Sequence, residues 1–162
     1  MTAPGAVMLT EILEQPRALH RLLEASDGEI TTVAGRIRAR DPRFVLLAAR
    51  GTSDHAALYL KYLIETRLGL PAGLVSPSTL TVYGASPHYD DVVWISMSQS
   101  GGSPDLVEST QRASAAGAMT VALTNSATSP LASAADAHVD VLAGPELAVA
   151  ATKSYTSELL AS

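Results

Sequence analysis

The sequence predicts an α/β fold, a doubly wound three-layer sandwich around a mainly parallel sheet of about five strands. Two observations predict it. Short apolar runs alternate with segments of helical periodicity along the chain, as in βαβ units with right-handed crossovers. Several of these runs also end abruptly in glycine, serine or threonine, which is typical of strands buried on both faces that reach the edge of a sheet.

The individual elements follow from apolar runs, turn residues and capping signals. Strands are expected at 44–49, 72–76, 92–95, 119–124 and 139–142, and helices at 54–68, 78–83, 104–116, after Ser129 and from Thr152. Ser53 or Asp54, Ser103 and Ser129 are the expected N-caps of three of these helices. Strands and helices thus alternate from residue 44 to the last residue.

The first 42 residues are expected to be a helical lead-in to a domain that spans 43–162. Pro16 should break or kink the first helix, and Ser26 with Glu29 matches the S-x-x-E capping box of a second one. At the other end, the last helix carries no closing signal. The chain is therefore expected to stop inside a helix and to belong to a longer product.

Two loops that follow strands have the composition of an anion site. The run at 92–95 leads into the serines and glycines of 96–103, and Pro104 then opens a helix; the run at 44–49 leads into Arg50–Ser53 in the same way. Hydroxyls, unpaired backbone N–H groups and the positive end of a helix dipole suit a phosphate monoester. Either loop alone could equally be a polar turn that caps a helix, but if the two strands are neighbours the loops face one pocket.

Composition and charge exclude several classes of function. The net charge is −5 and no Lys/Arg cluster occurs, so nucleic-acid binding is not expected. No long apolar segment occurs either, so we expect no membrane association and a cytoplasmic location. The absence of cysteine excludes thiolate chemistry, and the four histidines lie far apart, so neither a metal site nor a cofactor is expected.

Three stretches together resemble a known family. They are ARGTSDHA (49–56), SQSGGSPD (98–105) and GPELAVAATK (144–153). In this order and spacing they are similar to the sugar isomerase (SIS) domain, most closely the first of the two SIS domains in the isomerase half of glucosamine-6-phosphate synthase and in related amino-sugar-phosphate isomerases and deaminases. The resemblance implies a flavodoxin-like SIS fold.

The resemblance also implies a set of ligand residues. A sugar 6-phosphate would be held by Gly51, Thr52, Ser53, Ser98, Gln99, Ser100, Ser103, Val149 and Ala151. Two positions depart from the family pattern, since Ala151 replaces a serine and Asp54 places a carboxylate directly after the phosphate-binding serine. Glu146 and Lys153 match family positions and are weak catalytic candidates, because each could equally be a structural residue at the helix start.

The function implied is that of an enzyme acting on fructose 6-phosphate or glucosamine 6-phosphate. It would be an isomerase, an aminotransferase-like enzyme or a deaminase, without the glutaminase domain of the synthase. The resemblance places the base and the ring-opening histidine in a second SIS domain or across a dimer interface, so a homodimer or a second SIS domain is the expected partner. The alternative is a non-catalytic sugar-phosphate sensor or regulatory module.

Overall fold

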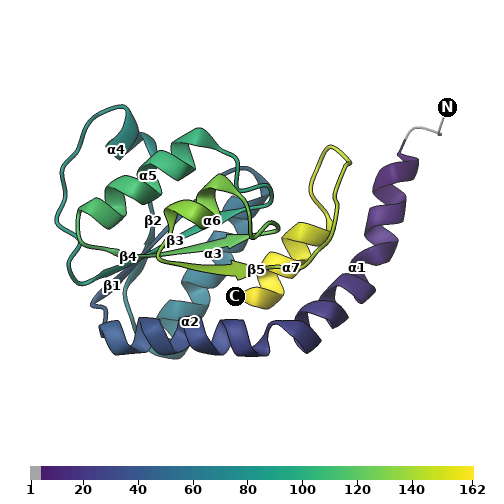
Figure 1. Cartoon of the computed structure of the whole chain (residues 1–162), viewed down its shortest axis with the longest axis horizontal. Helices are drawn as coiled ribbons and strands as arrows, with labels where there is room; N and C mark the ends of the chain where they lie inside the picture. The colour runs from purple at the N-terminus through teal and green to yellow at the C-terminus, as the bar shows by residue number, and fades with distance from the viewer. Residues whose placement is uncertain (1–4) are drawn as a thin grey trace.

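Five parallel strands form the centre of the chain in the computed structural model, which describes residues 5–162 (Figure 1). Their order is β2-β1-β3-β4-β5, as in a doubly wound sheet. The strands are β1 Phe44–Ala49, β2 Ala72–Leu74, β3 Val92–Ser98, β4 Met119–Thr124 and β5 Ala137–Asp140. The predicted α/β class and the five-stranded parallel sheet are thereby confirmed.

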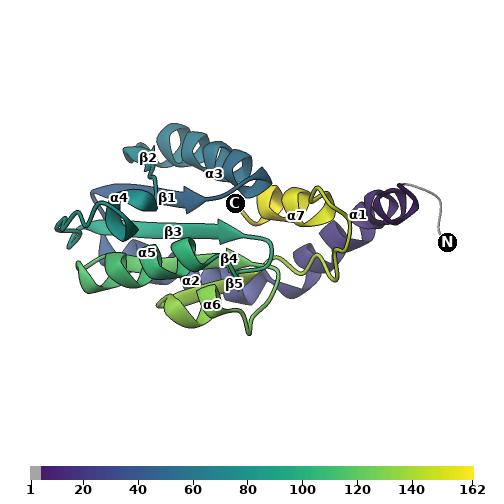
Figure 2. The same cartoon turned by 90° about the horizontal axis from the view of Figure 1, so that it is seen from above.

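Helices cover both faces of this sheet. They are α1 Ala6–Ala25, α2 Asp27–Arg40, α3 Thr52–Leu63 with a π-turn at Ile64–Leu68, α4 Ser78–Thr81, α5 Pro104–Ala115, α6 Pro130–Ala134 and α7 Lys153–Ala161. One apolar core joins the sheet to α2, α3 and α7, and a second joins it to α4, α5 and α6. Helix α1 lies beside α7 at one end of the molecule, as both views show (Figures 1 and 2).

The central strand β3 shows why the sheet is apolar on both faces. Val93 packs into the first core, whereas Trp94 is 0% exposed and packs into the second. The indole N–H of Trp94 donates to the Ser96 hydroxyl at 2.8 Å, and Ser96 is itself bonded to Thr110 of α5 at 2.7 Å. Each of these buried polar side chains therefore has a partner, as burial requires.

The lead-in helices differ from the prediction at two positions. Helix α1 continues through Pro16, although its axis changes direction along its length (Figure 1). Pro16 and Ile12 are both exposed, so the carbonyl that proline leaves unpaired can bond to water. The capping box is also wrong, because the buried Ser26 hydroxyl has no partner and Glu29 instead accepts from the Asp140 amide at 3.3 Å.

The predicted starts of the other helices have mixed outcomes. Ser129 caps α6 by accepting from the Ala132 amide at 3.2 Å, as expected. Ser103 occupies the N-cap position of α5 but makes no side-chain capping bond. Helix α3 begins earlier than predicted, with Gly51 at its N-cap, because a backbone φ of +60° there suits glycine and leaves the following hydroxyls free for other partners.

Gly101, in the loop after β3, is expected to tolerate no side chain. Its φ is +61°, and an added Cβ would lie 2.5 Å from Cβ of Ser129, the α6 cap. Gly101→Ala should therefore lower the free energy of unfolding by about 1–3 kcal/mol, measured by urea denaturation. Gly102→Ala is the matched control, because its Cβ would meet only the Ser100 hydroxyl at 3.6 Å. Equal effects of the two changes would show that Gly101 is no more sensitive to a side chain than Gly102.

Candidate functional site

The two loops singled out in the sequence lie next to each other. Strand β1 pairs directly with β3, from Phe44 opposite Val92 to Ala49 opposite Met97, so the loops that follow the two strands begin level at the carboxyl edge. An ion pair joins them, because Nε of Arg50 donates to Oδ2 of Asp105 at 2.7 Å. The two strands are therefore neighbours and their loops lie side by side, and a shared pocket between the loops stays a prediction.

The loop after β3 holds its shape through its own serines. Ser98 accepts from the Gly101 amide and Ser100 from the Gly102 amide, both at 3.2 Å. In both contacts the hydroxyl is the acceptor, so its proton remains available to a ligand. Gln99 reaches the next loop, since its side-chain amide lies 3.4 Å from the Glu146 carbonyl oxygen.

Glu146 is fully engaged at the start of α7. Its Oε1 accepts from the Thr152 amide at 2.6 Å, the Thr152 hydroxyl at 2.9 Å and the Lys153 amide at 2.8 Å, and its Oε2 accepts from the amide and hydroxyl of Ser154. Burial on its own would raise the pKa of Glu146, but these hydrogen bonds outweigh it and the pKa lies below the ordinary value. Glu146 thus caps a helix in this structure, and a catalytic role for it stays a prediction.

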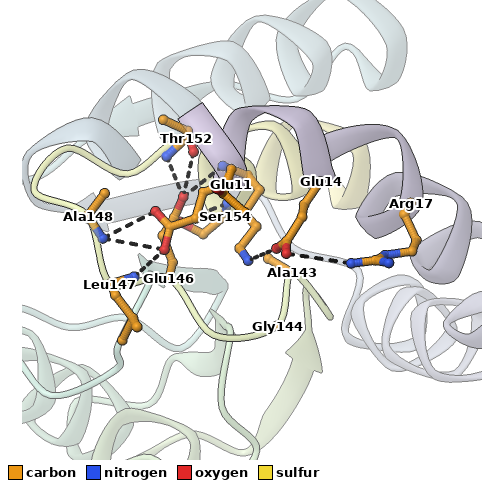
Figure 3. Close-up of polar contacts among 12 residues, drawn as sticks. Glu11, Glu14, Arg17, Ala143, Gly144, Glu146, Leu147, Ala148, Thr152 and Ser154 are labelled. Atoms are coloured by element: carbon orange, nitrogen blue, oxygen red, sulfur yellow. Dashed lines mark hydrogen bonds and ion pairs between the residues drawn. The ribbon is translucent and has the colours of Figure 1, made fainter. Parts of the chain in front are cut away.

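Helix α1 supplies two further carboxylates to the same region (Figure 3). Glu11 accepts from the amides of Leu147 and Ala148 at 2.5 and 3.2 Å. Glu14 pairs with Nζ of Lys153, which is 2% exposed, and this hydrogen bond lowers the pKa of Glu14. Lys153, the second catalytic candidate, is thus committed to α1. Sequence reasoning missed both glutamates, although their spacing of three residues places them on one helix face.

The tip of this loop projects into solvent. Val149 is 95% exposed, and Ala150 has a φ of +95°, a conformation that costs a non-glycine residue free energy. Ala151 is half-buried at the start of α7. The assignment of Val149 and Ala151 to a ligand shell stays a prediction.

Ser53 has a buried partner that the sequence did not suggest. Its hydroxyl donates to Oε1 of Glu158 at 2.8 Å, whereas Oε2 of Glu158 has no hydrogen-bond partner. Glu158 is 1% exposed. Burial raises the pKa of Glu158 to about 7, with a smaller contribution from the charge of Glu146, although the bond from Ser53 acts in the opposite direction.

Three other features of the described chain concern metal binding, membrane spans and cavities. Within residues 5–162, no three His, Asp or Glu side chains gather closely enough to hold a metal ion. No helix in that range is long and apolar enough to cross a membrane. An apolar cavity of about 630 Å³ lies between α2 and α3, away from the two loops.

The fold and loops define a doubly wound α/β domain whose hydroxyl-rich loops meet at the carboxyl ends of β1 and β3. The family model of the SIS domain matches residues 40–162, so the chain belongs to the SIS domain family. The resemblance seen in the three sequence stretches is thereby confirmed.

Known proteins agree with this assignment. Glutamine–fructose-6-phosphate aminotransferase (isomerizing) of Aquifex aeolicus is 39% identical over 155 residues, which are 95% of this chain and 26% of that protein. A candidate phosphosugar isomerase from Silicibacter pomeroyi superposes with a TM-score of 0.92 at 46% identity, covering 96% of this chain and 47% of that one. The C-terminal domain of glucosamine-fructose-6-phosphate aminotransferase from Francisella tularensis gives 0.85 at 30% identity, covering 99% and 47%.

Removing the Glu11 carboxylate should loosen the loop at 144–152. In Glu11→Ala the amides of Leu147 and Ala148 lose a charged acceptor, a bond worth roughly 1.5–3 kcal/mol. Hydrogen exchange of these two amides should accelerate by about tenfold or more. Glu24→Ala is the control, because Glu24 is an exposed residue of the same helix whose carboxylate pairs with His20 rather than with the loop. Unchanged exchange in Glu11→Ala would show that the loop does not depend on α1.

Glu158 should make the protein less stable as the pH rises. A carboxyl with a raised pKa binds its proton more tightly when folded than when unfolded, so its stabilising contribution is complete at low pH and is lost between about pH 4.5 and 7. Relative to Glu158→Gln, the wild type should lose up to about 3 kcal/mol of unfolding free energy across this window. Chemical denaturation at pH 5 and pH 8 measures the difference, and a constant difference would contradict the raised pKa.

Proposed function

We propose that this chain is the phosphosugar-binding SIS domain of an enzyme that acts on fructose 6-phosphate or glucosamine 6-phosphate. The observation that carries the proposal is the meeting of two hydroxyl-rich loops, each opening a helix, at the ends of neighbouring strands. The named activities of the relatives support the same substrate class. Isomerase, aminotransferase-like and deaminase reactions all remain within this proposal.

Phosphate recognition would rest on neutral donors. Arg50 is paired with Asp105, and Lys153 with Glu14, so both of these cations already have carboxylate partners. The hydroxyls of Ser98 and Ser100, together with the N-terminal ends of α3 and α5, would bind the phosphate oxygens. Ser53 would also face the phosphate, and Gly51, Thr52, Ser103 and Gln99 would complete the ligand shell. Val149 and Ala151 of the projecting loop would cover the sugar.

The proton transfer between C1 and C2 of the sugar needs a base that we place outside these loops. Glu146 has its oxygens occupied and a lowered pKa, so it is poorly suited to accept a proton. A second SIS domain or a second copy of the chain would supply the base. Residues 1–42 would be a helical lead-in, in which Glu11 of α1 would anchor the loop at 144–152, and the setting would be the cytoplasm.

Removing the hydroxyl of either Ser98 or Ser100 should weaken phosphosugar binding without unfolding the domain. Each hydrogen bond to a charged phosphate is worth roughly 1.5–3 kcal/mol, so Ser98→Ala or Ser100→Ala should raise the Kd for fructose 6-phosphate by about 10–100-fold in calorimetry. Ser86→Ala is the control, because Ser86 is exposed and lies before β3. Equal affinity for fructose and fructose 6-phosphate would overturn the proposed site.

Turnover separates an enzyme from a sensor. Exchange of the C2 proton of glucosamine 6-phosphate with deuterated water, followed by NMR, reports proton transfer directly. Exchange by the full-length protein supports the enzyme, and tight binding without exchange supports the regulatory module. We expect residues 1–162 alone to bind the sugar with little or no exchange.

A further inference from the structure

The Ser53 hydroxyl cannot donate to two acceptors at once. It carries a single proton, and in the structure that proton is directed at Oε1 of Glu158, 2.8 Å away. While Glu158 is ionised it can only accept, so Ser53 has no proton left for a phosphate oxygen. Once Glu158 is protonated, it can donate a hydrogen bond to the Ser53 oxygen. Ser53 can then donate its own proton to a phosphate oxygen of the bound sugar.

The surroundings of Glu158 favour the protonated form. Oε2 is buried without a partner, which is costly for a charged oxygen. The carboxylate that faces Glu158 from the preceding loop is Glu146, and it adds repulsion. Lys153, on the same helix, is turned to Glu14 of α1. On α3, Asp54 and His55 are exposed, and Glu158 forms no ion pair with any residue that the structure describes.

We propose that Glu158 is a positioning residue that couples phosphate binding to proton uptake through Ser53. The inference rests on the proposed function, since it needs Ser53 to face the phosphate ester. A bound phosphate favours the arrangement in which Glu158 is neutral for two reasons: Ser53 then has a proton to donate, and a second negative charge beside the phosphate is removed. The domain should therefore bind about one proton with each phosphosugar above neutral pH.

The test compares affinity and pH in the wild type and in Glu158→Gln. Fructose 6-phosphate is the probe, because it has no amine and its phosphate, with a second pKa of about 6, is a dianion throughout pH 7.5–9. The wild-type Kd should rise about tenfold per pH unit across this range. Glu158→Gln should stay within about twofold, because its side chain is neutral at every pH and its amide can donate to Ser53.

Calorimetry in buffers of different ionisation enthalpy gives a second readout. At pH 8 the wild type should take up close to one proton per sugar, and Glu158→Gln none. Ser53→Ala tests the part played by the hydroxyl: the variant should bind more weakly and lose the share of the pH slope that Ser53 carries, while the share due to charge repulsion remains. A full slope in Ser53→Ala would overturn the part played by Ser53.

Two negative results remain distinguishable. Equal pH slopes in the wild type and Glu158→Gln, with binding intact, would overturn this inference and leave the proposed function standing. Absence of fructose 6-phosphate binding at pH 6 in both proteins would overturn the proposed function and this inference with it.

Discussion

The direct pairing of β1 with β3 is the constraint on which the candidate site depends. The strand order reverses at this pair, since β2 lies on one side of it and β4 on the other. The helices that follow therefore leave towards opposite faces, α3 into one core and α5 into the other. Their N-terminal ends flank the crevice that opens at such a switch point. The strand order alone therefore determines where the candidate site lies.

Three buried or half-buried glutamates near α7 show how the surroundings decide the state of a carboxyl. Glu146 accepts several N–H and O–H bonds and is held ionised. Glu14 faces an ammonium group and is also held ionised. Glu158 has one hydroxyl donor, and its other carboxyl oxygen has no hydrogen-bond partner. The effect of burial therefore dominates, and Glu158 keeps its proton to a higher pH. The number of donors and their charge separate the three cases.

Local signals explain what the sequence could predict. The apolar runs at 44–49 and 119–124 coincide with β1 and β4, and Ser129-Pro130 marks the start of α6, because these signals depend on a few adjacent residues. The other three strands overlap their predicted ranges with different ends, since polar residues such as Ser96 and Ser98 continue β3. The partners of Glu11 and Ser53 lie more than a hundred positions away along the chain, and no periodicity reports such contacts. Ser26 has a different, local cause: it is the C-cap of α1 as well as the N-cap of α2, and its αR backbone differs from the extended backbone of a capping serine.

The contact between Glu11 and the loop at Leu147 also constrains the order of folding. The two residues are 136 positions apart, so at 5–20 residues per second the ribosome needs roughly 7–27 s to make the partner of α1 after α1 itself. The sheet can pair from β1 to β4 during this interval. The contacts of α1 with the loop at 144–152 and with α7 cannot form before these segments exist, and Leu13 of α1 is exposed even in the final fold. A segment synthesised before the rest of this domain is thus among the last parts of it to find its place, and during that interval it is open to chaperones.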